Sequence, residues 1–340
     1  MTTPPSREYK LISRIQNLLP SIHPSAYEEL IGDDAAVRVN KAAGEKLVMT
    51  TDISVQDVHF SLETMTLEEV GYRAMVSNLS DCAAMGALPD SALVQLVFPA
   101  DTTGLDESVE SIYRGFARAS ERWQFPIVGG DLSSGQVWTL GIALIGSVPP
   151  GERVLKRRGV REGDALWVSG RPGESAAGLA VLGRWGRQRA PEMYTRFVQA
   201  HISPRPRIRE GRVLAKQTGV HAVMDLSDGL SKDVATLCFD NHLGFLFDSA
   251  AIRAPESMVR LAEEVKVDWK EWFFHGGEEY ELLIAADPDL DLRAQSGLEA
   301  AALNRLGSFT REFEGVRIPK PEGGTENLVH RSWDHAKRVL

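Results

Sequence analysis

The sequence has only two cysteines among its 340 residues, and this shortage excludes a fold held together by disulfides. Cys82 and Cys238 are far apart, so they also lack the paired spacing of a zinc site. Each lies in an apolar stretch of helical character. We therefore expect both to be small buried side chains.

Long apolar runs and a surplus of positive charge are also missing. No run reaches the roughly 20 apolar residues that cross a bilayer, and the polar start, Met1–Tyr9, lacks the apolar stretch of a secretion signal. We expect a cytoplasmic protein.

The formal net charge of −9 argues against nucleic acid or an anionic membrane as a partner, because both require clustered Lys and Arg. A phosphorylated small molecule remains compatible, since Asp residues that hold divalent cations bind phosphates through them.

Three familiar nucleotide-binding patterns are absent as well. The sequence contains no G-x-x-x-x-G-K-[ST] phosphate loop, no dinucleotide fingerprint and no protein-kinase motif set. One glycine-rich stretch, Ser169–Ser175, leads from a predicted strand to a predicted helix. It either presents backbone amides to a phosphate or forms a plain turn.

The apolar patterning predicts alternating strands and helices in two α/β domains, since the chain is too long for one typical core. Thr66 and Glu69 form the pattern of a capping box at the start of a helix that Gly86 ends. An apolar stripe predicts a second helix from Asp106 to Trp123. The strands predicted in this half span residues 46–51, 92–98, 125–128 and 138–148.

A domain boundary is predicted in Val148–Gly163, which combines Pro and Gly with a basic cluster. It divides the chain into a first domain, 1–150, and a second domain, 151–340. The alternation restarts after this segment. The second half is predicted to contain strands at 165–169, 221–226, 244–247 and 280–285, and helices at 174–185, at 208–218 and from Ser231 onwards.

Acidic residues recur where these apolar elements meet Gly, Ser or Thr. Thr50–Asp52 and Gly129–Asp131 are predicted to end strands, and Asp225–Gly229 follows a third. Carboxylates at strand ends can converge in the crevice where α/β proteins bind ligands. Each of these residues taken alone is more readily explained as a turn or cap residue, because Asp and Gly are common there.

Asp81 is harder to explain as a turn or cap. It shares a helix face with Asn78 in an otherwise apolar stretch, where an unpaired buried carboxylate costs several kcal/mol. A bound cation removes that cost. Several carboxylates with nearby hydroxyl groups suit Mg²⁺, which prefers hard oxygen ligands, and more than one ion is compatible with the number of Asp residues.

Seven motifs occur in an order that resembles the thiamine-monophosphate kinase family over nearly the whole chain, from Leu11-Ile12 to Trp333-Asp334-His335. They are Gly32–Ala36, Thr51-Asp52 followed by Val58–Phe60, Asn78–Gly86, Gly129–Asp131, Pro172–Leu179, Asp225–Leu230 and Gly276–Leu282. The resemblance implies the two-domain α/β fold shared with aminoimidazole ribonucleotide synthetase. It also implies a homodimer in which the first domains pair into a β-barrel.

The resemblance further implies roles for individual residues. The Mg²⁺ ligands would be Asp34, Thr50, Thr51, Asp52, Asp81, Asp131, Asp225 and Asp228. ATP would contact Gly130, Asp131, Arg157 and Ser227, and the thiamine phosphate would contact His59, Glu278 and Trp333. Two positions depart from the family pattern: Glu279 replaces an Asp, and Ala336 replaces a Phe.

The implied reaction is the last step of thiamine diphosphate biosynthesis, in which ATP phosphorylates thiamine monophosphate by direct in-line transfer with the help of several Mg²⁺ ions. No catalytic side-chain base or nucleophile is expected, because a phosphate monoester already carries a nucleophilic oxygen. Two alternatives stay open. One is another ATP-dependent enzyme of the same superfamily. The resemblance implies a reactive Cys near one end of the chain for such an enzyme, and this chain lacks a Cys before Cys82 or after Cys238. The other is a nucleotide-binding regulatory protein without catalysis.

Overall fold

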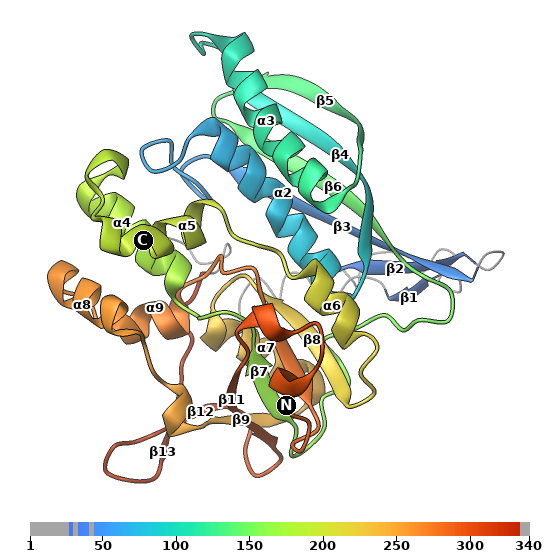
Figure 1. The fold of residues 1–340 in the computed structure, drawn as a ribbon, viewed down its shortest axis with the longest axis vertical. Coiled ribbons are helices and arrows are strands. Elements are labelled where there is room, and N and C mark those ends of the chain that lie inside the picture. The colour runs from blue at the N-terminus through green and yellow to red at the C-terminus, as the bar shows by residue number, and fades with distance from the viewer. Residues whose placement is uncertain (1–26, 30–32, 41–43, 334–340) are drawn as a thin grey trace.

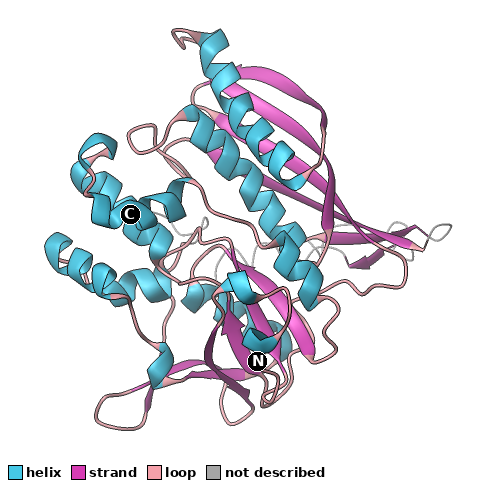
Figure 2. Ribbon diagram, viewed as in Figure 1, coloured by secondary structure: helices cyan, strands magenta, loops and turns pink. Residues whose placement is uncertain are grey.

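The strands of the protein form two separate sheets in a computed structural model that describes residues 27–29, 33–40 and 44–333. Figure 1 shows the two sheets in different parts of the molecule, each with its own helices, and Figure 2 shows the same view by secondary structure. Both sheets are mixed, because β4 with β5 and β9 with β12 are parallel pairs among otherwise antiparallel neighbours. This bears out the predicted two-part α/β architecture.

The first sheet has six strands in the order β1-β2-β3-β6-β4-β5. Helices α2 (Leu67–Ala84) and α3 (Leu105–Trp123) pack on one face of this sheet (Figure 1). The other face carries exposed side chains such as Leu93 and Ile53, the latter 57% exposed. Its strands are β1 (Tyr27–Glu29), β2 (Ala36–Asn40), β3 (Glu45–Val55), β4 (Leu88–Pro99), β5 (Ile127–Gly135) and β6 (Thr139–Val148).

Two strand ends predicted in this sheet are wrong. Thr50–Asp52 lies inside β3, because β3 pairs with β6 continuously from Lys46 to Val55. Gly129–Asp131 lies inside β5, which stays paired with β4 as far as Gly135. Polar residues interrupt the apolar pattern of these strands, but the backbone ladder continues through them. The acidic residues therefore project from within strands β3 and β5 and not from the loops that follow these strands.

The helix signals in this half are confirmed. The Thr66 hydroxyl accepts a hydrogen bond from the Glu69 amide, and the Glu69 carboxylate accepts one from the Thr66 amide, so the capping box is complete. Gly86, with φ of +67°, follows the end of α2 in the left-handed conformation that favours glycine. Both cysteines are buried free thiols, as expected.

The second sheet has seven strands in the order β13-β12-β9-β11-β7-β10-β8. These strands are β7 (Ala165–Val168), β8 (Val220–Leu226), β9 (Gly244–Phe247), β10 (Glu281–Ala286), β11 (Asn304–Thr310), β12 (Gly315–Pro319) and β13 (Thr325–Asn327). The accompanying helices are α4 (Glu174–Trp185), α5 (Thr195–Ile202), α6 (Ile208–Leu214), α7 (Leu230–Asn241), α8 (Glu256–Val265) and α9 (Trp269–His275). The helix predicted over 208–218 thus ends at Leu214, before a turn that leads into β8.

Helix α2 lies between the two sheets and belongs to an apolar cluster with residues from both domains. It packs on β3 and β6 of the first sheet and also contacts α5, α6, β8 and β10 of the second domain. Almost every residue of α2 is buried, and this includes the polar residues Arg73, Asn78 and Ser80. Polar side chains of α2 are therefore held at the junction of the domains. Within the described part of the chain, none of the helices has the length and apolar character needed to cross a membrane.

Candidate active site

Three carboxylates from separate segments meet at the domain junction. Asp34 precedes β2, Asp81 lies in the last turns of α2, and Asp225 lies near the end of β8. Their oxygens lie within 4.8 Å of one another. The Asp225 residue is only 4% exposed, and the Asp34 side chain only 3%. The packing of α2 against both β3 and β8 therefore assembles an acidic cluster (Asp34, Asp81 and Asp225) from both domains.

Hydroxyl groups surround this acidic cluster. Thr50 Oγ1 donates a hydrogen bond of 2.5 Å to Asp81 Oδ2, and Ser80 Oγ donates one of 2.9 Å to Asp225 Oδ2. Ser227 Oγ lies 3.4 Å from the other Asp225 oxygen. These hydroxyl donors are neutral and satisfy only part of the acceptor capacity of the carboxylate oxygens. Asp34 Oδ2 is buried without a hydrogen-bond partner.

The electrostatics of the acidic cluster favour a bound cation. Burial raises the pKa of Asp81 well above its usual range, and the charges of Asp52, Asp225 and Asp34 raise that pKa further. Burial and the charge of Asp34 likewise raise the pKa of Asp225 well above its usual range. Ionised carboxylates are therefore unfavourable here unless a positive charge joins them. The donors are hard oxygens, so the residues present fit Mg²⁺.

One cation of the protein itself touches the acidic cluster. The Arg157 guanidinium forms ion pairs with Asp34 and Asp33. Burial alone lowers the pKa of Arg157, but the charges of Asp34, Asp33 and Asp240 together outweigh burial and raise this pKa overall. Arg157 is fixed between the domains by these contacts. Its predicted contact with ATP would therefore be made by a guanidinium that already balances part of the Asp charge.

The other predicted metal ligands on the first sheet divide between its two faces. Thr50 and Asp52 lie on the face that α2 covers, because Thr50 bonds Asp81 and the Asp52 amide donates a hydrogen bond of 3.1 Å to Asn78 Oδ1. Thr51 is exposed on the opposite face, where its hydroxyl donates to the Ile142 carbonyl. Side chains that alternate along a strand cannot all reach one point.

Gly130 and Asp131 lie even farther away in the same protomer. The pairing places Asp52, Ile142, Val94 and Gly130 in one row across β3, β6, β4 and β5. Three strand spacings of about 4.8 Å therefore separate Asp52 from Gly130 by roughly 14 Å. Gly130 allows the close approach of β4, since a Cβ at this position would collide with the Val94 carbonyl oxygen.

The loop after β8 is held by a residue that the sequence motifs did not single out. Asp233 Oδ2 accepts hydrogen bonds of 3.1 to 3.2 Å from the amides of Ser227, Asp228 and Gly229. Lys232 pairs with Asp228 at 2.8 Å and donates to the Trp333 carbonyl at 3.1 Å. The chain end containing Trp333, which is 47% exposed, is thereby tied to this loop. Asp334–Ala336 lie outside the described residues.

A small pocket opens beside these elements. It is lined by His59, Glu278, Arg73 and Tyr280 together with Ser54, Phe60, Met65, Val70 and Ala74. Two of the predicted substrate contacts, His59 and Glu278, thus share one pocket, while Trp333 is not among its lining residues. His59 Nδ1 accepts a hydrogen bond from the Val55 amide, so this nitrogen is unprotonated and the ring is held in one orientation.

The glycine-rich stretch is not available to a phosphate in the way that the sequence left open. Glu279 Oε1 accepts hydrogen bonds from the amides of Gly173 and Ser175 at 2.9 and 3.1 Å. The carboxylate therefore caps the start of α4 from inside the protein. Burial raises the pKa of Glu279 well above its usual range. Glu279, which departs from the family pattern, therefore has structural partners in this protein. The contacts favour the interpretation of Ser169–Ser175 as a turn.

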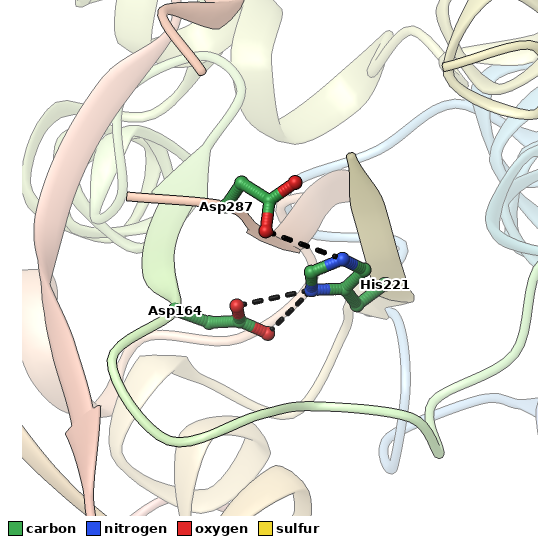
Figure 3. A group of neighbouring side chains, drawn as sticks. All are labelled: Asp164, His221 and Asp287. Atoms are coloured by element: carbon green, nitrogen blue, oxygen red, sulfur yellow. Dashed lines mark hydrogen bonds and ion pairs between the residues drawn. The ribbon is translucent and has the colours of Figure 1, made fainter. Parts of the chain in front are cut away.

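A second group with two carboxylates lies at the opposite end of β8. Figure 3 shows His221 of β8 between Asp164, which precedes β7, and Asp287, which follows β10. His221 Nδ1 lies 2.9 Å from Asp164, whereas Nε2 lies 3.5 Å from Asp287. Each carboxylate faces a different ring nitrogen, so the group joins three neighbouring strand ends and does not converge on one ion.

Comparisons with known proteins agree with this arrangement. The AIR synthase related protein N-terminal domain family matches residues 32–148, and the C-terminal domain family matches residues 161–318. The thiamine-monophosphate kinase of Bacillus subtilis (strain 168) is 31% identical over 334 residues, which cover 95% of this chain and 98% of that protein. The thiamine-monophosphate kinase of Synechococcus elongatus is 33% identical over 282 residues, with 81% and 82% covered.

A solved structure supports the same relationship. AaThiL complexed with AMPPCP and TMP superimposes with a TM-score of 0.82 at 30% sequence identity, and 96% of each chain is covered. Identity above 30% across nearly the full length of a relative, together with a shared two-domain fold, identifies the family. The chain belongs to the thiamine-monophosphate kinase family of enzymes, built from the N- and C-terminal domains of AIR synthase related proteins.

Proposed function

We propose that this protein uses ATP to phosphorylate thiamine monophosphate to thiamine diphosphate. The names of its relatives and the neighbour that binds AMPPCP and TMP support this function. The single structural observation that carries it is the acidic cluster next to the His59–Glu278 pocket. Tyr280 lines that pocket, and the charges of Asp52 and Asp225 both raise its pKa, so the pocket and the acidic residues are neighbours.

Asp34, Asp81 and Asp225, with Asp52 and Thr50 beside them, would hold Mg²⁺. When bound, the ions would neutralise phosphate charge that otherwise opposes the approach of two anionic substrates. Asp228 and Ser227 lie on the loop fixed by Asp233, at the end of the strand that carries Asp225. A rigid loop of this kind would position additional oxygen ligands and a contact to ATP.

The reaction needs orientation more than proton transfer. A terminal oxygen of thiamine monophosphate would attack the γ-phosphorus in line, and the bond from that phosphorus to the β,γ-bridging oxygen would break to release ADP. A phosphate monoester is largely ionised near neutral pH, so the residues around it need not remove a proton. His59 and Glu278 would hold the acceptor, and the partly buried Arg157 would keep the Asp34 carboxylate in place.

We also propose that the first domains pair into a homodimer. The uncovered face of the first sheet exposes Ile53 and Leu93, and the edge strand β5 exposes Val128 and Leu132. Pairing would bury these apolar side chains. It would also bring Gly130 and Asp131 of the partner subunit toward the acidic cluster, which they do not reach within one protomer. A β-barrel formed by the first sheets of the two protomers is compatible with this face.

A cytoplasmic location stays a prediction.

Release of ADP tests the proposed function against a nucleotide-binding protein that lacks kinase activity. The protein is incubated with ATP and Mg²⁺, and ADP is measured with thiamine monophosphate, with thiamine and without an acceptor. A kinase of the proposed specificity releases ADP only with thiamine monophosphate. ADP formation that is indifferent to the acceptor, or absent altogether, would reject the proposal.

A further inference from the structure

Arg73 is a buried cation that lines the His59–Glu278 pocket. It lies in α2 among apolar neighbours and is only 5% exposed. Its guanidinium forms an ion pair with Glu278 in the second domain. Nη1 also lies 3.3 Å from His201 Nε2 and 3.2 Å from Met65 Sδ. An α2 side chain of the first domain is therefore fixed by residues of the second.

The contact with His201 determines the protonation of that ring. A guanidinium has only donors, so His201 Nε2 must be the acceptor and Nδ1 must carry the proton. Nδ1–H then donates to Ser175 Oγ at 3.2 Å. Burial and the neighbouring Arg73 charge lower the pKa of His201 to about 2. His201 thus stays neutral at physiological pH and holds the guanidinium by hydrogen bonding alone.

Glu278 is held in an unusual backbone conformation. Its φ is +62°, and that of Tyr280 is +54°, both in the left-handed region that side chains other than Gly rarely adopt. The Glu278 amide donates to the Ser227 carbonyl at 2.5 Å, and the next residue, Glu279, caps α4. Such backbone strain persists only where the surroundings enforce it, and it concentrates at functional sites.

We propose that Arg73 is a positioning residue for the acceptor: it holds the Glu278 carboxylate in the pocket, where that carboxylate meets the cationic ring portion of thiamine monophosphate. This inference rests on the proposed function. A carboxylate suits the positive thiazolium ring and the amino group of the pyrimidine, and it repels a phosphate. Apolar Phe60, Met65 and Val70 supply walls for a flat ring. The buried Arg73 charge alone would repel a cationic ring, so the pocket accepts a cation only while Glu278 balances that charge.

Arg73→Gln tests this role through KM. The neutral side chain releases Glu278 from its fixed position, so KM for thiamine monophosphate should rise about tenfold or more, while KM for ATP stays within about twofold. Thiamine is tested as a competitive inhibitor, because it shares the rings of thiamine monophosphate and lacks the phosphate. Its inhibition constant should rise by the same factor as KM for thiamine monophosphate. Arg73→Lys should recover part of the loss, since it retains the charge without the guanidinium geometry.

Arg207→Gln is the matched control. Arg207 is also buried and pairs with a carboxylate, Glu281, but it does not line the pocket. Its loss should lower Tm without changing KM for thiamine monophosphate. If Arg73→Gln does not fold, Arg73→Lys decides on the same KM values. An unchanged KM for thiamine monophosphate, or an equal rise for ATP, overturns the inference.

A double variant separates positioning from direct contact. Glu278→Gln alone leaves an uncompensated buried cation, which repels the thiazolium ring. Arg73→Gln combined with Glu278→Gln should therefore bind thiamine better than Glu278→Gln alone. If the losses of thiamine affinity in the two single variants multiply in the double variant, Arg73 acts on the acceptor independently of Glu278, and the inference is wrong. If the wild type forms no thiamine diphosphate and binds no thiamine, the proposed function itself has failed; a failure of the variants in an active enzyme concerns Arg73 only.

Discussion

Asp81 of the first domain and Asp225 of the second present carboxylate oxygens within 4.8 Å of each other at the domain junction. Burial is the largest cause of the raised pKa of both residues, and the charges of Asp34 and Asp52 raise both pKa values further. This proximity is unfavourable for the metal-free fold and useful for binding a cation. Stability and activity should therefore respond in opposite directions when one of these charges is removed.

Asp81→Asn is expected to stabilise the metal-free protein and to impair the enzyme. Removing one buried like charge should increase the free energy of unfolding by about 1 to 3 kcal/mol, while kcat falls by about two or more powers of ten because phosphate charge is less well neutralised. Denaturant unfolding in chelator and steady-state kinetics measure the two effects. A variant that is both less stable and fully active would contradict this interpretation of the cluster.

Stabilisation by Mg²⁺ should depend on pH. A carboxyl group whose pKa is higher in the folded than in the unfolded protein makes the fold less stable as pH rises from its ordinary pKa through its raised one. Metal-free Tm should therefore fall as pH rises above the ordinary carboxyl range and these groups ionise, and the Tm gain from Mg²⁺ should grow with pH. Differential scanning fluorimetry with and without Mg²⁺ measures both trends. A Mg²⁺ effect that is constant or shrinks with pH would remove the support for a cation in this cluster.

Asp52→Asn and His59→Ala should fail differently although both residues belong to one segment. Asp52→Asn keeps the shape but loses a charge near Asp81, so kcat should drop by about two powers of ten and recover partly at higher Mg²⁺. His59→Ala removes a pocket side chain, so mainly KM for thiamine monophosphate should rise. Both constants are measured for both substrates at two Mg²⁺ concentrations. Near-normal kcat for Asp52→Asn at limiting Mg²⁺, or an effect of His59→Ala on ATP alone, would reverse the assignment.

Mixing two inactive variants tests the dimer. If Asp131 of the partner subunit completes the site, Asp131→Ala and Asp81→Asn affect different chains of the same site. Co-expressed chains should then form heterodimers in which one of the two sites is intact. Each heterodimer should have up to about half the activity of a wild-type dimer. Each variant expressed alone is the control. No recovery in verified heterodimers would place both residues in the same protomer or outside the site.

The sequence predicted the elements with strong local signals and missed features created by packing. The Thr66–Glu69 capping box and the ordered Asp motifs are local, and the former is confirmed. The extension of β3 and β5 through polar residues could not be predicted, because their partners β6 and β4 supply the pairing. Arg73 offered the same signal as Asp81, a single charge in an apolar helix, but its partners Glu278 and His201 are remote in sequence. Asp233 was hidden because its role as a cap depends on the loop geometry.

Isotope transfer tests the central claim most directly. ATP labelled with ¹⁸O at all four oxygens of the γ-phosphoryl group is incubated with the protein, Mg²⁺ and thiamine monophosphate, and the products are resolved by phosphorus NMR. Attack of the acceptor oxygen on the γ-phosphorus predicts thiamine diphosphate whose terminal phosphorus carries three ¹⁸O atoms and a bridging ¹⁶O from the acceptor, with the fourth ¹⁸O left on ADP. Labelled orthophosphate without thiamine diphosphate, or a labelled bridging oxygen in the product, would contradict the account.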